Sequence, residues 1–209
     1  LLFCEVREDL GLGREVERTL RKLSLRPERL NVKTFAAADL ALEYAENALL
    51  DALGVAPTVL EQRVPLEALD LCRAMQPAEI AALAAALRPC LLERGQRLFA
   101  AGDDGAELYL VLRGRVDIRL PATDDRYKRL AIYGPGTMFG DIAFLDPGPR
   151  AAEAVAVRSS ELLMLGRADF DRLRDDYPDA AIALLLALGQ QQSRALRWSA
   201  QEIQRLIQW

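Results

Sequence analysis

The chain has 209 residues, of which 51% are hydrophobic and 28% are charged, a composition typical of folded globular proteins rather than disordered chains. A formal net charge of −4 and a pI of about 5.1 leave no basic excess to neutralise the phosphates of DNA or RNA. Histidine is absent, which excludes histidine-based catalytic triads, histidine-ligated zinc or haem, and a histidine pH switch.

The cysteines and the apolar runs narrow the cellular setting. Cys4, Cys72 and Cys90 lie far apart without a CxxC pair, so we expect small core residues in a reducing compartment rather than a zinc or redox site. Apolar runs such as 180–188 are shorter than the roughly 20 residues of a membrane-spanning helix. The apolar start at Leu1 lacks a signal-peptide pattern. We therefore expect a cytoplasmic piece of a longer polypeptide, at the inner membrane only through its parent protein.

Residues 1–53 predict a small α/β unit with a parallel sheet. Strand patterns at 1–6 and 30–35 are each followed by a helical pattern, at 14–25 and from Asp39 onward. The apolar stripe of the second helix is Leu42, Ala45, Leu49 and Leu53. Strands that alternate with helices favour parallel pairing. Two strands make only part of a sheet, so we expect further strands before the first residue.

Residues 54–76 predict a linker, because a glycine and several prolines interrupt them and only 66–75 have a helical pattern. The pattern changes at Pro77, a residue type that suits the first position of a helix. The apolar face of that helix is Ile80, Leu83, Ala84 and Leu87. We predict that 77–209 form a second domain.

Short strands separated by glycine turns dominate this second domain. Eight of the 13 glycines of the chain fall between positions 95 and 148. We expect strands at 108–112, 130–133, 154–157 and 162–165, followed by helices at 167–175 and 178–209. Gly114 is expected to turn the chain. Beyond it, Val116, Ile118 and Leu120 should point inward, and Arg115, Asp117 and Arg119 outward. The fold class is α+β, with an antiparallel β-roll or jelly roll and flanking helices.

Residues 139–153 contain the pattern that points to chemistry. Gly140 allows a sharp turn, and a single helical turn at 141–145 would present free N–H groups to an anion. Arg150 follows and supplies a cationic fork that suits one phosphate. Asp141 beside them suits a sugar hydroxyl, which donates a hydrogen bond to a carboxylate.

This segment, Phe-Gly-Asp-Ile-Ala-Phe-Leu-Asp-Pro-Gly-Pro-Arg-Ala-Ala-Glu, resembles the phosphate-binding cassette of cyclic nucleotide-binding domains. The stretches 97–103 and 107–116 resemble the opening strands of that family, and the resemblance covers 77–206. It implies that Asp141 holds the ribose 2′-hydroxyl, that Arg150 pairs with the cyclic phosphate, and that flanking amides complete the cradle. The implied ligand-binding residues are Gly140, Asp141, Ile142, Ala143, Pro149, Arg150 and Ala151.

Three positions bear on whether and what this cassette binds. Asp141 stands where glutamate is usual and reaches one methylene less. Glu153 stands where threonine or serine is usual, and it would repel a phosphate or pair with Arg150 unless it points away along the next strand. Ala151 lies where guanine-preferring members of the family carry threonine, so the resemblance favours cAMP over cGMP.

Residues 35–50 resemble the last helix of STAS domains, which lie at the cytoplasmic end of bacterial SulP-type anion transporters. Some of these transporters carry a cyclic nucleotide-binding domain after the STAS domain, and certain bacterial glutaminases have a similar tail. The alternative is a generic amphipathic helix of an α/β domain.

The last helix carries an apolar stripe at helical spacing, formed by Leu196, Ala200, Ile203 and Ile207. Three interpretations stay open: the helix packs on its own domain, it forms a dimer seam, or one of its side chains caps a bound base. The candidates for the cap are Trp198, Ile203 and Leu206.

The sequence thus predicts a regulatory module that binds a cyclic nucleotide and relays this to an attached transporter or enzyme. The expected partners are the nucleotide and upstream domains of the same polypeptide, with a homodimer left open and without metal or nucleic acid. The alternative is a degenerate cyclic nucleotide-binding fold that acts as an interaction or oligomerisation module. We expect no catalysis, because histidine and a nucleophile motif are missing. A catabolite-activator-like transcription factor is disfavoured, because no helix-turn-helix or basic patch follows the roll.

Overall fold

The computed structural model describes residues 62–121 and 127–207 and, before them, only scattered positions between Leu2 and Leu53. The chain divides into two compact units, Leu1–Val59 and Leu60–Trp209.

In the first unit, two short strands pair in parallel. β1 (Leu2–Phe3) lies beside β2 (Lys33–Thr34), with Leu2 opposite Lys33. This pairing agrees with the predicted parallel sheet. Helical residues lie between positions 41 and 52, where Ala41 is buried but Leu49 is 60% exposed, so the predicted stripe is not buried along its length. The rest of the predicted 1–53 unit, including nearly all of the helix at 14–25, lies outside the described residues.

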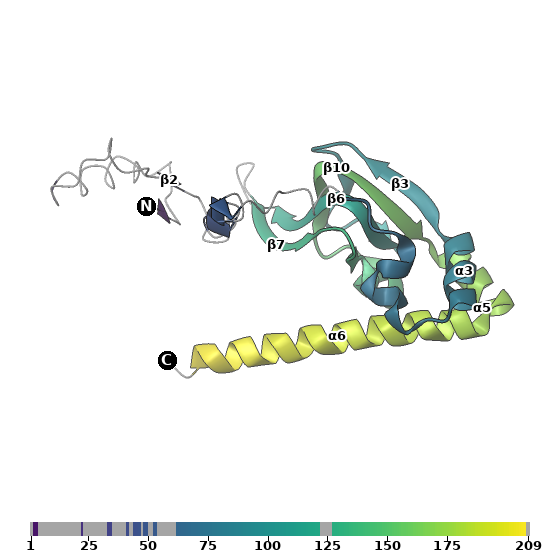
Figure 1. Cartoon of the computed structure of the whole chain (residues 1–209). Helices are drawn as coiled ribbons and strands as arrows, with labels where there is room; N and C mark the ends of the chain where they lie inside the picture. The colour runs from purple at the N-terminus through teal and green to yellow at the C-terminus, as the bar shows by residue number, and fades with distance from the viewer. Residues whose placement is uncertain are drawn as a thin grey trace. The chain divides into compact units, whose positions relative to one another are not determined.

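The second unit is built on an antiparallel sheet with the strand order β3-β10-β6-β7 (Figure 1). β4 also pairs with β10, β8 pairs with β6, and β5 and β9 form a separate two-stranded ladder. The strands are β3 (Arg88–Leu92), β4 (Arg97–Phe99), β5 (Asp104–Gly105), β6 (Leu108–Pro121), β7 (Tyr127–Tyr133), β8 (Met138–Phe139), β9 (Gly148–Pro149) and β10 (Glu153–Leu165). This arrangement confirms the predicted α+β class with an antiparallel sheet and flanking helices.

Helices cover one end and one side of the sheet (Figure 1). They are α3 (Pro77–Ala86), α4 (Asp141–Leu145), α5 (Arg167–Asp176) and α6 (Pro178–Ile207), with the 3-10 helices η4 (Leu66–Ala68) and η5 (Asp70–Ala74) before them. α6 packs against α3, α5 and η5. The helix predicted to begin at Pro77 is confirmed, and Leu83 of its apolar face is completely buried.

Part of the predicted linker packs as core. Leu66, Leu69, Leu71, Cys72 and Met75 are buried in one cluster together with residues of α3, α5 and α6. This short stretch carries too many apolar side chains for a solvent-exposed linker. They bury most of their surface against the helices. Burial raises the pKa of the Cys72 thiol to about 11, which suits the inert core role predicted for it.

β6 is continuous where a turn was predicted. Gly114 has a φ of 90°, and a Cβ there would lie 2.3 Å from the hydroxyl of Ser160 on β10. The β6–β10 register shifts on both sides of this point, so the glycine accommodates an irregularity within a paired strand. The strands predicted at 154–157 and 162–165 are likewise one strand, β10.

The prediction that Asp117 points outward is also wrong, because its side chain is only 1% exposed. Arg129 on the neighbouring strand β7 forms an ion pair with it, with 3.0 Å between Nε and Oδ2. A strict in-out alternation misses such pairs, because a charged residue can be buried when an opposite charge lies on the adjacent strand.

We predict that Gly114→Ala lowers the free energy of unfolding by about 1–3 kcal/mol more than Gly136→Ala does. Gly136 has a similar φ of 89°, but a Cβ there would contact nothing within 4 Å. The control therefore carries the backbone strain without the collision with Ser160. Urea unfolding of both variants measures the difference, and equal losses would contradict it.

Asp169 of α5 joins that helix to β3. Its buried carboxylate accepts a hydrogen bond of 2.7 Å from Arg88 and pairs with Arg172. The hydrogen bond from Arg88, followed by the charges of both arginines, holds the pKa of Asp169 below its ordinary value. A lowered folded-state pKa stabilises the fold above the unfolded pKa of about 3.9, and this contribution is lost as the pH falls through the lower value.

We accordingly expect Asp169→Asn to reduce the free energy of unfolding near pH 7 by roughly 1–2 kcal/mol, since both arginines are largely exposed. The difference from the parent chain should shrink as the pH falls below about 4, where the carboxyl of the unfolded parent chain becomes protonated. Unfolding curves measured from pH 7 to pH 3 test this, and a difference independent of pH would refute it.

Candidate functional site

The site is centred on the junction between β8 and α4, where the chain turns at Gly140. This residue has a φ of 84°, and a Cβ there would lie 2.6 Å from the carbonyl oxygen of Glu107. Only glycine fits this close approach in the left-handed region. α4 then begins at Asp141, and the first N–H groups of a helix have no partner within it. The predicted helical turn at 141–145 is thus confirmed.

Arg150 is buried beside this turn. Its side chain is 4% exposed, and its Nη2 lies 2.6 Å from Oε2 of Glu107. The same group donates to the carbonyl of Glu107, and Nη1 lies 3.5 Å from the carbonyl of Gly140. Nε is buried without a hydrogen-bond partner. The guanidinium therefore keeps one unused donor, which lies close to Gly105.

Aromatic rings and a turn hold Arg150 in place. Its Cζ lies 4.3 Å from the ring centroid of Phe99 and 5.8 Å from that of Tyr109, within the range of cation–π attraction. Its N–H donates to the carbonyl of Asp103, and its carbonyl accepts from the N–H of Gly102. Burial, followed by the charge of Glu107, raises the pKa of Tyr109 to about 12, so its phenol stays protonated.

Asp141 is buried as well, and its Oδ2 accepts a hydrogen bond from Nε2 of Gln192 on α6. Tyr133 lies close enough that burial, and then the charge of Asp141, raises its pKa. The residue predicted to hold a ribose hydroxyl is therefore already linked to the last helix.

The remaining predicted residues surround these two side chains in different ways. Ala143 is buried, whereas the side chain of Ile142 is 67% exposed, so at most its backbone can contribute to a cradle. Pro149 is exposed in β9, opposite Asp104, and Ala151 is exposed directly after Arg150.

Glu153 does not reach Arg150. It lies at the start of β10, where Oε1 is 3.4 Å from Nε of Arg119 and Oε2 is 3.8 Å from Nη1 of Arg97. Of the outcomes considered for this departure, the structure shows the one in which the carboxylate points away from the predicted phosphate position.

Sequence reasoning missed Glu107 and Gln192. Glu107 is the first residue of the stretch 107–116, and its charge just before an apolar strand was the available signal for it. Nothing in the local pattern around Gln192 distinguishes it from the glutamines on either side. Two of the proposed base caps are not in place, because Trp198 is 66% and Ile203 is 57% exposed. The side chain of the third, Leu206, lies outside the described part of the chain.

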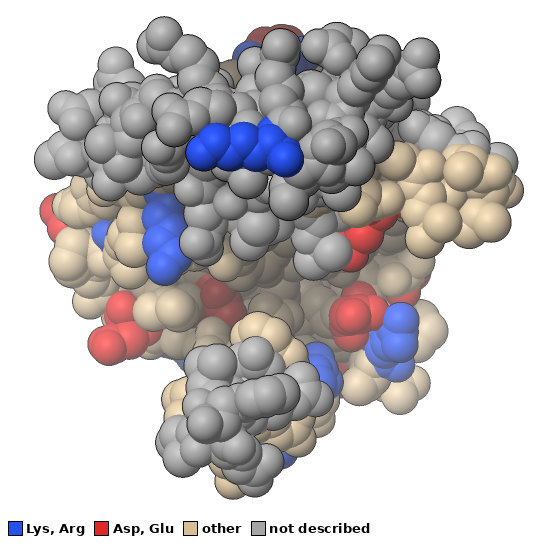
Figure 2. Space-filling view, turned by 90° about the vertical axis from the view of Figure 1, so that its left-hand side faces the viewer, with Lys and Arg blue, Asp and Glu red and all other residues tan. Residues whose placement is uncertain are grey.

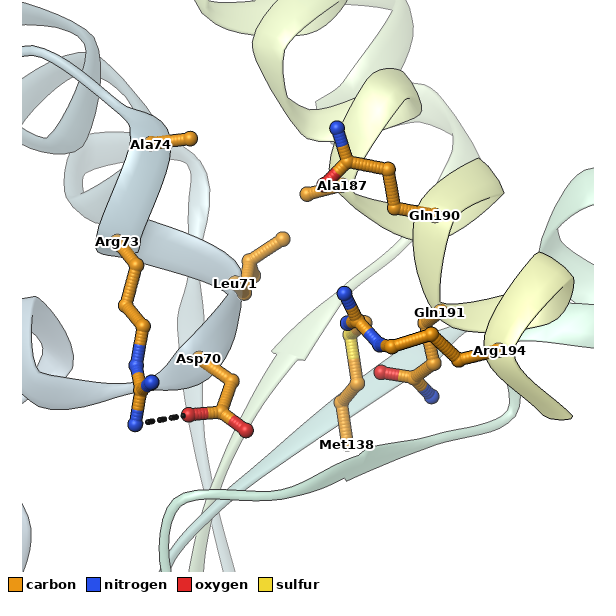
Figure 3. Close-up of a pocket in the computed structure, with 9 residues that line it drawn as sticks. All are labelled: Asp70, Leu71, Arg73, Ala74, Met138, Ala187, Gln190, Gln191 and Arg194. Atoms are coloured by element: carbon orange, nitrogen blue, oxygen red, sulfur yellow. Dashed lines mark ion pairs between the residues drawn. The ribbon is translucent and has the colours of Figure 1, made fainter. Parts of the chain in front are cut away.

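A cavity of about 330 Å³ lies between η5 and α6 (Figure 3). Met138 of β8 and Gln191 and Arg194 of α6 line it, opposite the ion pair between Arg73 and Asp70. None of the predicted ligand-binding residues lines this cavity. One residue that lines it is nevertheless close to them in sequence, since Met138 precedes the turn at Gly140 by two positions.

Among the described residues, no group of three cysteine, aspartate or glutamate side chains is placed to hold a metal ion. No helix in the described part of the chain is long and apolar enough to cross a membrane.

Comparison with known proteins identifies the fold around this site. The family model of the cyclic nucleotide-binding domain matches residues 90–177, which contain Glu107, Asp141 and Arg150. These residues are a cyclic nucleotide-binding domain. The predicted family resemblance is confirmed for this part of the chain.

Two bacterial regulators illustrate the relationship. The chain is 36% identical over 123 residues to a CRP-like cAMP-activated global transcriptional regulator of Mycobacterium tuberculosis, covering 57% of this chain and 54% of that protein. It is 41% identical over 99 residues to the cyclic AMP receptor protein of Thermus thermophilus, covering 46% of each. The chain therefore spans about half the length of the curated relatives that it matches.

Solved structures agree with these matches. The N-terminal domain of a transcriptional regulator from Streptomyces coelicolor A3(2) is 34% identical, with a TM-score of 0.56, covering 62% of this chain and 93% of that one. The catabolite activator protein of Thermus thermophilus is 33% identical, with a TM-score of 0.58 and coverage of 66% and 62%.

The comparisons leave two predictions without support. They give no evidence for a STAS domain in residues 1–53, so that resemblance and the link to anion transporters stay predictions. The expected absence of a nucleic-acid partner is not supported either, because the relatives include transcriptional regulators. Described acidic and basic side chains are interspersed on the face in Figure 2, so charge alone does not identify a nucleic-acid surface there.

Proposed function

We propose that this chain is a regulatory module that binds a cyclic nucleotide, with the cyclic phosphate on Arg150 and the ribose on Asp141. The observation that carries the proposal is the guanidinium of Arg150, which is buried and aligned by Glu107. Its Nε has no hydrogen-bond partner, and its Nη1 lies 3.5 Å from the carbonyl oxygen of Gly140, just before α4. An unpaired donor on a buried cation is costly, and a phosphate oxygen would satisfy it.

Glu107 orients Arg150, the proposed partner of the phosphate, without using all of its N–H donors. Guanidinium has five N–H donors, and the bonds to Glu107 and the contact with Gly140 use only the two terminal nitrogens. The carboxylate also balances the charge of Arg150. A phosphate can therefore add to this arrangement through Nε and through the free amides of α4 without separating Arg150 from Glu107.

We favour cAMP as the ligand. Ala151 offers no hydroxyl at the position where the family resemblance places a guanine-preferring threonine, and relatives of this chain are named for cAMP. The signal would be relayed through α6 to the rest of the polypeptide, which we place in the cytoplasm. Binding shifts the population of α6 positions only as far as the nucleotide prefers one of them.

The first prediction of this proposal is that Arg150→Ala weakens cAMP binding by roughly 2–5 kcal/mol, because it leaves a buried phosphate without its cation. Calorimetric titration with cAMP and cGMP measures this loss and the preferred base. Arg94→Ala, which removes an exposed arginine elsewhere in the domain, should bind like the parent. Undiminished binding by the Arg150 variant would eliminate this site.

A glycine pair sharpens the same test without removing a charge. Gly105 and Gly148 face each other in the β5–β9 ladder. A Cβ at Gly105 would lie 2.2 Å from Nε of Arg150, whereas one at Gly148 would approach only a carbonyl oxygen at 3.9 Å. We expect Gly105→Ala to weaken cAMP binding and Gly148→Ala to leave it nearly unchanged.

A second candidate function is assembly through α6, which stays open to a second copy of the chain. Exposed residues recur along this helix with alternating steps of four and three: Ile182, Leu186, Gly189, Ser193, Leu196, Ala200 and Ile203. Such a repeat keeps one seam facing a partner helix in a left-handed coiled coil. Because the repeat lies on one helix, the simplest partner is the same helix of a second copy.

This candidate predicts that Leu196→Arg converts a dimer into a monomer, because it places a charge at a large apolar position of the seam. Ala195→Arg adds the same charge to an exposed position beside the seam and should remain dimeric. Sedimentation equilibrium measures both masses. A monomeric parent chain at about 100 µM, well above a micromolar dissociation constant, would dismiss the dimer.

A further inference from the structure

Among the described side chains of α6, Gln192 is the one that bonds directly to a proposed ligand-binding side chain. Its Nε2 donates to Oδ2 of Asp141, which lies 51 residues earlier in the chain. Gln192 is half-buried, between the fully buried Leu188 and the 70% exposed Leu196. It therefore occupies the point at which α6 leaves the core.

The bond leaves Asp141 able to accept a further hydrogen bond. A carboxylate has two oxygens and about four acceptor positions, and Gln192 uses one of them on Oδ2. Oδ1 has no hydrogen bond within the described part of the chain. Since Gln192 is neutral, it restrains the carboxylate and leaves its negative charge in place. An arginine or a lysine would neutralise that charge. The acceptor needed for a hydroxyl donor is therefore preserved.

We propose that Gln192 is a positioning residue that fixes Asp141 for the ribose 2′-hydroxyl and thereby makes the site selective for ribose over 2′-deoxyribose. This inference rests on the proposed nucleotide-binding function. Aspartate has a shorter reach than the usual glutamate, so its oxygen has less freedom to find the hydroxyl. A second bond on Oδ2 holds the carboxylate in one orientation, with Oδ1 presented to the ligand.

The same bond makes α6 part of the ribose-binding site. The nucleotide gains from the fixed orientation of Asp141 only while Gln192 stays within hydrogen-bond distance. Ribose binding and this position of α6 therefore stabilise each other by the same free energy. An altered ribose should weaken the effect of the nucleotide on α6, even where the phosphate still binds.

The test compares cAMP with 2′-deoxy-cAMP, two ligands that differ only in the hydroxyl. Calorimetric titration gives the ratio of their affinities for the parent chain, for Gln192→Ala and for Gln190→Ala, which removes an exposed glutamine of the same helix. We expect the parent to prefer cAMP by roughly 10- to 100-fold, the range of a hydrogen bond to a charged group. Gln192→Ala should lower this ratio at least fivefold, and Gln190→Ala should not change it.

A loss of packing alone would weaken both ligands equally and leave the ratio intact, which would overturn the proposal. Tighter binding of both nucleotides by Gln192→Ala would also overturn it, because Gln192 would then compete with the ligand. Asp141→Ala should bind cAMP and 2′-deoxy-cAMP with equal affinity. A preference for cAMP that remains in this variant would show that Asp141 does not bind the ribose. If the folded parent chain binds neither nucleotide, the proposed function itself fails.

Hydrogen exchange gives a second readout on the same variants. In the parent chain, cAMP should slow amide exchange in the part of α6 around Gln192 more than 2′-deoxy-cAMP does. In Gln192→Ala the two nucleotides should act alike. Equal protection by both nucleotides in the parent chain would show that ribose binding is not coupled to α6.

Discussion

The burial of one arginine is the constraint around which this domain is arranged. The guanidinium of Arg150 is almost fully removed from water, and such a charge is tolerated only with a close counter-charge. Glu107 supplies the counter-charge from the start of β6, and the ring of Phe99 covers one face. Gly105 and Gly140 leave the space that the guanidinium and the adjacent turn require. Side chains distant in sequence therefore converge on a single cation that keeps a free Nε.

The second functional side chain depends on a different part of the molecule. Asp141 begins α4, and its carboxylate is held by Gln192 of α6 rather than by any strand of the sheet. The phosphate half of the proposed site thus rests on the strands and the turns beside them, while the ribose half is attached to a helix that packs on the core only along its first half. In the proposed function, this division would let the site report occupancy, since its ribose half is attached to the point at which α6 leaves the core.

The local pattern was sufficient to predict the turn at Gly140 and the helical turn after it, because both are defined by neighbours in sequence. It was insufficient wherever a contact joins distant segments. Asp117 is buried because Arg129 lies on the adjacent strand, and 66–75 form core because three helices close over them. Gly114 was expected to reverse the chain, yet it lies within β6, where a side chain would collide with β10. Register and long-range pairing, which periodicity does not encode, account for these differences.

The exposed seam of α6 and the ribose-binding contact share one turn of helix. Gln192 faces Asp141, and the next residue, Ser193, lies on the seam with Leu196 one turn further on. A second copy that packs on the seam and a nucleotide that engages Asp141 would both fix the position of this turn. If both prefer the same position, each strengthens the binding of the other, and the coupling is equal in both directions. Assembly and nucleotide binding through α6 would then be parts of a single equilibrium and not alternatives.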